Sequence, residues 1–221
     1  MADYTLYIGN KAYSSWSLRG WLACKLAGIA FDEAMIPLYQ PDSRARYLAI
    51  SPTGKVPSLH HGKRVIWESL AIGEYLAEQV RDAGLWPADP DARAWARSIA
   101  TEMHGGFGEL RKAMWMNVRR RFPGKGRTPG ALADIARIEA IWTETRARFG
   151  AGGLYLFGPT LNLADCMYAP VVARFWTWAP PLAAPAQDYV DALWAHPLMR
   201  EWVGDAAKEP WVYDGYETPA D

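Results

Sequence analysis

The chain has 221 residues, which exceeds the roughly 100–150 of a common single domain, so we expect two domains. Its 24 basic and 24 acidic residues balance, which argues against a nucleic-acid partner and against attraction to an anionic membrane. The cysteines are too few for a secreted disulfide scaffold, the histidines lack metal-ligand spacing, and no segment has the pattern of a membrane span or signal peptide. We therefore expect a cytoplasmic protein without a metal.

The first part of the chain alternates strand and helix patterns. Its predicted elements, in chain order, are a strand at 4–8, a helix at 16–26, a strand at 31–38, a short helix or turn at 41–50, strands at 56–60 and 64–67, and a helix at 68–80. The first three make a βαβ unit, and the last three make a hairpin followed by a helix. This order predicts a mixed four-stranded sheet in a domain of residues 1–80.

The second part of the chain is predicted to be all helical. Prolines, a glycine and several charges make residues 81–91 a linker, and the helical domain then spans 92–221. One long helix is expected to carry the apolar residues Trp95, Ile99, Met103, Phe107, Leu110 and Met114. Further helices are expected around Ile135–Phe149 and at 163–176, 188–195 and 198–208. Gly105 and Gly106 would each cost the first helix about 1 kcal/mol relative to alanine.

The loop of residues 11–17 is the first candidate for chemistry. It leads into a helix, and the N–H groups at a helix N-terminus favour anions. A hydroxyl of Ser14 or Ser15 could there donate a hydrogen bond to a thiolate. The alternative interpretation is that these serines only cap the helix.

Two further features suit a peptide-like ligand. Pro57 begins a predicted strand, and a cis bond before it would leave the N–H and C=O of Val56 free. Glu68 and Ser69 lie between a strand and a helix, where they could hold the ammonium and carboxylate of an amino-acid head group. The alternatives are an ordinary proline at the start of a strand and a capped helix with an acidic residue in its first turn.

Two other motifs are predicted to be structural. Asn162 and Asp165 have the spacing of a capping box, which stabilises the start of a helix. A basic cluster is predicted at a helix C-terminus, where cations are favourable, and consists of Arg119, Arg120, Arg121, Lys125 and Arg127. Because the net charge is zero, we do not assign this cluster to nucleic acid.

These motifs together resemble the cytosolic glutathione S-transferases, over the whole chain and in the order of that family. SPTGKVPSL is similar to the family's loop before its cis-proline, WESLAIGEYL to the helix whose Glu and Ser hold the γ-glutamyl group, and LADCMYAPV to its capping box. The resemblance implies an α/β plus all-α fold, with a thioredoxin-like N-terminal domain and an all-helical C-terminal bundle. It also implies glutathione as co-substrate.

The resemblance assigns roles to residues of the first domain. YSSWSLRGWLA resembles the serine-type classes, above all the zeta-like pattern SSCSWRVR, although Trp16 stands where that pattern has a cysteine. Ser14 is then the expected thiolate donor, with Ser15 and Tyr7 as alternatives. The residues implied to bind glutathione are Lys55, Val56, Pro57, Glu68 and Ser69.

A hydrophobic electrophile is the expected second substrate, in a pocket predicted to contain Met103, His104, Phe107 and Trp115. The tail of residues 209–217 either covers this pocket or packs on the surface. The implied function is that of a glutathione transferase in detoxification, and a homodimer is the implied assembly. Three alternatives remain open: a non-enzymatic ligand- or partner-binding protein, a zeta-like isomerase and a glutathione-dependent peroxidase.

Overall fold

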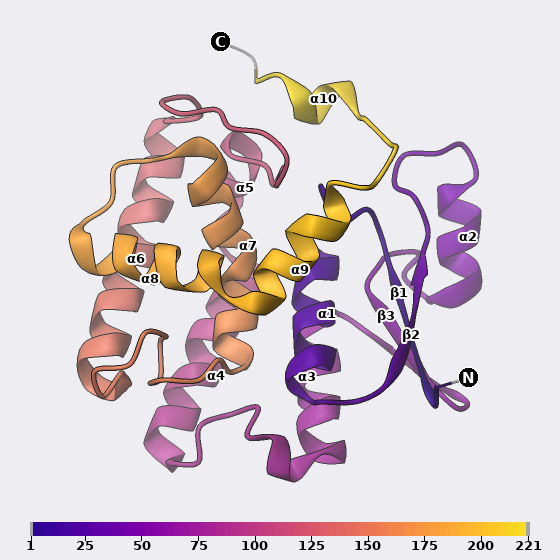
Figure 1. Cartoon of the computed structure of the whole chain (residues 1–221), viewed down its shortest axis with the longest axis horizontal. Coiled ribbons are helices and arrows are strands. Elements are labelled where there is room, and N and C mark those ends of the chain that lie inside the picture. The colour runs from indigo at the N-terminus through magenta and orange to yellow at the C-terminus, as the bar shows by residue number, and fades with distance from the viewer. Residues whose placement is uncertain (1, 220–221) are drawn as a thin grey trace.

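The computed structural model describes residues 2–219, so residue 1 of the first predicted domain and residues 220–221 of the second lie outside the described residues. A small sheet with three helices stands beside a larger group of helices (Figure 1). The elements of the first part are β1 (Tyr4–Ile8), α1 (Ser15–Leu26), β2 (Phe31–Met35), α2 (Ser43–Ile50), β3 (Ser58–His61), β4 (Arg64–Trp67) and α3 (Ser69–Gln79).

The sheet is mixed and has the strand order β2-β1-β3-β4. β1 is parallel to β2, with Tyr4 opposite Phe31, and antiparallel to β3, with Tyr7 opposite Ser58. A parallel neighbour needs a crossover connection, which α1 supplies. The predicted four-stranded sheet and its order of elements are therefore confirmed.

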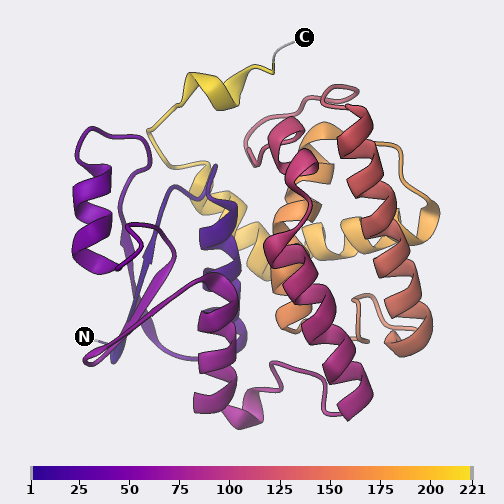
Figure 2. The same cartoon turned by 180° about the vertical axis from the view of Figure 1, so that it is seen from behind.

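Helices cover both faces of this sheet. α1 and α3 pack against each other on the face toward the helical part, whereas α2 lies on the opposite face (Figure 2). Two strands are shorter than predicted, and proline explains both differences. β2 ends at Met35, shortly before Pro37, and β3 begins at Ser58 because Pro57 has no N–H to donate to a ladder.

The helical part surrounds one buried helix. Its elements are α4 (Pro90–Gly105), α5 (Gly108–Ala113), α6 (Pro129–Phe149), α7 (Leu163–Trp178), α8 (Ala184–Ala195), α9 (Pro197–Ala206) and α10 (Asp214–Glu217). Nearly every residue of α7 is buried, and this helix packs on α1, α4 and α8. α7 therefore joins the helical part to the helix that carries the serines.

The single long helix expected to run through Met114 is wrong, because the chain leaves the helical path after Gly105. Phe107 has a left-handed φ of 60°, and a Cβ on Gly106 would lie 2.7 Å from the carbonyl oxygen of Glu102. Arg111 then donates to the carbonyl oxygens at the end of α4, including that of Gly106 at 3.0 Å. Satisfying these carbonyls stabilises the early end of α4.

The predicted capping box is confirmed at the start of α7. The Asn162 side chain accepts from the N–H of Ala164 at 2.8 Å, and Asp165 accepts from the N–H of Asn162 at 3.0 Å. The same carboxylate also accepts from the N–H of Leu156 and from the hydroxyl of Tyr189. Asp165 therefore ties the start of α7 to α8 and to the preceding loop.

Among residues 2–219, no helix is both long enough and apolar enough to cross a membrane.

Candidate functional site

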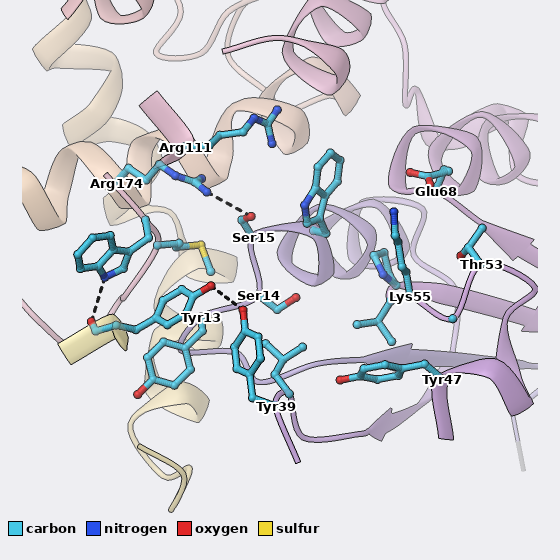
Figure 3. Close-up of a pocket in the computed structure, with 18 residues that line it drawn as sticks. Tyr13, Ser14, Ser15, Tyr39, Tyr47, Thr53, Lys55, Glu68, Arg111 and Arg174 are labelled. Atoms are coloured by element: carbon cyan, nitrogen blue, oxygen red, sulfur yellow. Dashed lines mark hydrogen bonds between the residues drawn. The ribbon is translucent and has the colours of Figure 1, made fainter. Parts of the chain in front are cut away.

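A cavity of about 590 Å³ lies where the loops of the first part meet the helical part. Figure 3 shows that its labelled residues come from the start of α1, from α2 and the loops on either side of it, from the start of α3 and from the helices α5 and α7. The residues that line it are Tyr13, Ser14, Ser15, Trp16, Leu38, Tyr39, Tyr47, Thr53, Gly54, Lys55, Val56, Pro57, Glu68, Arg111, Trp115, Met116, Arg174 and Tyr216.

Two serines stand side by side at the N-terminus of α1. Ser14 caps the helix: its Oγ accepts from the N–H of Ser17 at 3.3 Å and donates to the Ser17 hydroxyl at 2.7 Å. Ser15 Oγ accepts from Nη2 of Arg174 at 3.3 Å. Figure 3 shows Ser14 facing the part of the cavity with Lys55 and Thr53, whereas Ser15 points toward Arg174. The two hydroxyls thus face different parts of one cavity.

The loop before β3 presents free main chain to the cavity. The Val56–Pro57 bond is cis, which confirms the expectation from the sequence. Within residues 2–219, no hydrogen bond joins the main chain of Val56 to another residue. Lys55, Val56 and Pro57 all line the cavity. An N–H and C=O left unpaired beside a cavity are available to a peptide-like ligand.

Glu68 and Ser69 lie together at the start of α3, but only Glu68 lines the cavity. Its carboxylate lies 3.4 Å from Nε2 of His104. Ser69 is buried, and its hydroxyl has no hydrogen-bond partner among the described residues. Burial and the nearby Arg19 lower the pKa of His104, while Glu68 raises it, so the net direction is down. The imidazole of His104 is therefore mainly neutral at pH 7 and does not neutralise the carboxylate of Glu68.

Two arginines make the other end of the cavity cationic. Arg174 on α7 is buried, and burial together with Arg111 lowers its pKa to about 9, which leaves it charged at neutral pH. Arg111 on α5 lies with its guanidinium 5.0 Å from the ring centroid of Trp16. Within residues 2–219, neither arginine forms a salt bridge, and Nε of Arg174 has no hydrogen-bond partner. A buried cation without a carboxylate partner, as Arg174 is, favours an anionic ligand.

The arginines were missed in the sequence because they lie in separate helices and match no motif. The one available signal was a charged residue, Arg174, inside the apolar run LADCMYAPVVARFWTW. Lys, Arg, Asp and Glu are seldom fully buried unless they are paired, so an arginine in such a run is a candidate for function.

Of the four residues expected to form the second-substrate pocket, only Trp115 lines the cavity. Met103 and Phe107 are buried in the core of the helical part, and His104 lies between Glu68 and the ring of Trp16. The early end of α4 explains this correction. Because the chain turns at Phe107, α5 and the following segment reach the cavity in place of α4.

Tyr7, an alternative thiolate donor, does not line the cavity; its ring packs on His60 at a centroid distance of 4.7 Å.

The basic cluster is not at a helix C-terminus, which corrects the expectation. It lies in the non-helical segment between α5 and α6. Arg119 donates to the carbonyl oxygens of Glu209 and Trp211 and to the hydroxyl of Tyr13. Arg120 pairs with Glu217. These cations therefore hold the C-terminal tail, which lies against the cavity.

In the part of the chain that the structure describes, no group of three or more His, Cys, Asp or Glu side chains could hold a metal ion.

Comparisons with known proteins identify both parts of the chain. Residues 13–79 match the family model of the glutathione S-transferase N-terminal domain, and residues 93–205 match that of the C-terminal domain. The maleylpyruvate isomerase of Ralstonia sp. is 30% identical over 179 residues, which cover 73% of this chain and 80% of that protein. The maleylacetoacetate isomerase of Rhizobium meliloti is 30% identical over 190 residues, with 77% and 82% covered.

A solved structure with the same fold is the holo form of a maleylpyruvate isomerase, described as a bacterial zeta-class glutathione S-transferase. It superposes with a TM-score of 0.72 at 24% identity, covering 93% of this chain and 98% of the other.

Proposed function

We propose that this chain, which belongs to the glutathione S-transferase family, binds glutathione in its cavity and activates the thiol through the hydroxyl of Ser14. Glutathione is the co-substrate of this family. The observation that carries the proposal is that one cavity is lined both by Ser14, at the N-terminus of α1, and by Val56, whose main chain is free. The two cysteines are buried and unpaired, which favours action in the reducing cytoplasm.

The glutathione tripeptide can be matched to the cavity group by group. The main chain of Val56 offers an N–H and a C=O to the cysteinyl residue. Glu68 offers a carboxylate to the γ-glutamyl ammonium. Ser69 does not line the cavity, but its hydroxyl, buried and unpartnered beside Glu68 at a helix N-terminus, is the expected donor to the γ-glutamyl carboxylate. Lys55 and Pro57 complete this side of the cavity.

A hydrogen bond from Ser14, together with the N-terminus of α1, supplies enough free energy to keep the glutathione sulfur ionised at neutral pH. A free thiol has a pKa near 8.5, and lowering it by about 2 units requires roughly 2.7 kcal/mol. A hydroxyl hydrogen bond to a charged acceptor contributes about 1.5–3 kcal/mol, and the N-terminus of α1 adds about 0.3–1 kcal/mol. To donate to sulfur, Ser14 gives up only its bond to the Ser17 hydroxyl. No protein base is then needed.

The cationic end of the cavity favours an anionic second substrate over the purely hydrophobic one expected from the sequence. Arg111 and Arg174 face the cavity without carboxylate partners. Maleylpyruvate and maleylacetoacetate, the substrates named for two relatives, are unsaturated carboxylic acids. We therefore place cis–trans isomerisation of such an acid first among the reactions of this site.

In isomerisation, the thiolate adds to a conjugated double bond and the electron pair moves to the carbonyl oxygen. Rotation about the resulting single bond and expulsion of the thiolate then give the trans product and free glutathione. The second candidate is transfer of glutathione to an electrophile, favoured by the aromatic lining of Trp16, Tyr39 and Trp115. Both reactions begin with the same thiolate.

Changing Ser14 to alanine should raise the pH midpoint of thiolate formation in the glutathione complex by about 1–2 units, because one charge-assisted hydrogen bond is lost. The midpoint is measured from thiolate absorbance. Ser98→Ala, on the exposed side of α4, is the control and should titrate like the wild type. An unchanged midpoint would exclude Ser14, and Ser15→Ala would then be the variant expected to shift.

Changing Glu68 to alanine should weaken glutathione binding by about 10-fold or more, since a charged partner of the ammonium is removed. Titration calorimetry measures this affinity. Glu78→Ala removes an exposed carboxylate from the same helix and should bind as the wild type does. Equal affinity for the Glu68 variant would show that the head group lies elsewhere.

Changing Arg174 to methionine should raise KM for maleylpyruvate by about 10-fold, because an anion loses a buried cationic partner. KM for chlorodinitrobenzene, which has no carboxylate, should change little. Thermal stability should not fall, since replacing a buried charge by an apolar side chain is often neutral or stabilising. Arg200→Met, on the exposed side of α9, is the control. An unchanged KM for maleylpyruvate would contradict the anionic site.

A homodimer is the proposed assembly, and the edge of the sheet offers a surface for it. β4 is an edge strand, and Val65 and Trp67 on it are 36% and 39% exposed. Sedimentation equilibrium should give a dimer for the wild type and a weakened dimer for Trp67→Glu. A monomeric wild type would contradict this assembly.

A further inference from the structure

The C-terminal tail, residues 209–217, returns from the helical part to the front of the cavity. Figures 1 and 2 show it leaving α9 and passing above the sheet, with α10 near its end. The tail follows α9 and contains α10, the last helix of the chain. Its contacts nevertheless reach the loop before α1 and the loop after β2. Those are the two loops that carry Ser14 and Tyr39.

The tail holds the loop before Ser14 through two carboxylates. Glu209 accepts from the N–H of Lys11 at 2.6 Å and from the N–H of Ala12 at 3.1 Å. Glu217 accepts from the hydroxyl of Tyr13 at 2.6 Å. All three residues that precede Ser14 are thus bound by the tail.

The two carboxylates are themselves held in place. Glu217 also accepts from Nδ2 of Asn117 at 3.1 Å and pairs with Arg120. Arg119 donates to the carbonyl oxygen of Glu209 at 3.0 Å. Cations and an amide from the segment between α5 and α6 therefore fix the tail while the tail fixes the serine loop.

The tail also closes one side of the cavity. Tyr216 lines it, and its hydroxyl is hydrogen-bonded to that of Tyr39 at 2.6 Å, a bond drawn at Tyr39 in Figure 3. The main-chain oxygen of Tyr216 accepts from Trp115 at 3.0 Å and from Asn117 at 2.8 Å. Tyr216 therefore bridges the helical part and the loop between β2 and α2 across the cavity.

We infer that the tail is a working part of the active site, with two separate tasks. Glu209 is a positioning residue that sets the loop of Lys11 and Ala12, and through it the direction of the Ser14 hydroxyl. Tyr216 is a specificity-determining residue that closes the second-substrate side of the cavity through Tyr39. The inference rests on the proposed function, because both tasks are defined by the glutathione thiolate and its co-substrate.

The two tasks predict different defects in two conservative variants. Glu209→Gln keeps the side-chain shape but leaves one oxygen for two N–H groups, so the serine loop loosens. The thiolate midpoint should rise by about 0.5 unit or more and kcat should fall about 10-fold. Tyr216→Phe keeps the ring and loses only the bridge to Tyr39. KM for maleylpyruvate should rise about 3-fold or more, with the thiolate midpoint unchanged.

The matched control is Asp214→Asn, an exposed carboxylate in the same tail, which should titrate and turn over like the wild type. Circular dichroism and thermal unfolding of all three variants show whether the fold is kept. Tyr216→Phe removes a single oxygen, so it tests the second task even if Glu209→Gln does not fold.

The outcomes separate this inference from the proposed function. If wild-type protein leaves the thiolate midpoint of glutathione near the value of about 8.5 of a free thiol, the proposed function fails and the inference falls with it. If the wild type forms the thiolate but both variants match Asp214→Asn in midpoint, kcat and KM, the inference alone is overturned. The split expected here, with the midpoint moved by Glu209→Gln and only KM moved by Tyr216→Phe, would not arise from a general loss of stability.

Discussion

The arrangement of this molecule depends on the ion pairs of the buried Lys11 ammonium. It pairs with Glu33 on β2 and with Asp205 on α9, each at 2.9 Å, and lies 5.3 Å from the ring centroids of Trp21 and Trp202. One residue thereby ties the sheet, the first helix and the last long helix to the loop that carries the serines. The ammonium is buried, whereas the carboxylates of Glu33 and Asp205 are 32% and 37% exposed, so either one still compensates Lys11 when the other is removed.

The chemistry of the site follows from the groups around the loop that Lys11 holds in place. The N-terminus of α1 and the Ser14 hydroxyl favour a negative sulfur at one end of the cavity. At the other end, Arg111 and Arg174 favour a negative substrate, and neither forms a salt bridge within residues 2–219. In the proposed function, the cavity brings two anions together, which an apolar pocket would not do.

The sequence predicted the features that depend on near neighbours along the chain. The strand of residues 4–8 and the capping box of Asn162 follow from local signals and form as expected, and Ser14, one of the two serines considered as a cap, caps α1. The cis bond at Pro57 was one of two local interpretations, and the resemblance to the family favoured it. The order of the predicted strands and helices indicated the mixed four-stranded sheet, and the resemblance of ordered motifs indicated the family.

Only the tertiary structure decided how distant segments meet. Met103 in α4 and Phe107 just before α5 are both buried, so the apolar spacing continues past the end of α4. Periodicity alone therefore predicted one helix where there are two. The packing of α7 on α1 set Arg174 beside Ser15, and the return of the tail set Tyr216 over the cavity. Periodicity and capping are local, whereas these contacts depend on which faces pack together. The sequence therefore determined the family and the end of the cavity with Ser14, Val56 and Glu68, and the fold determined the cationic end and the position of the tail.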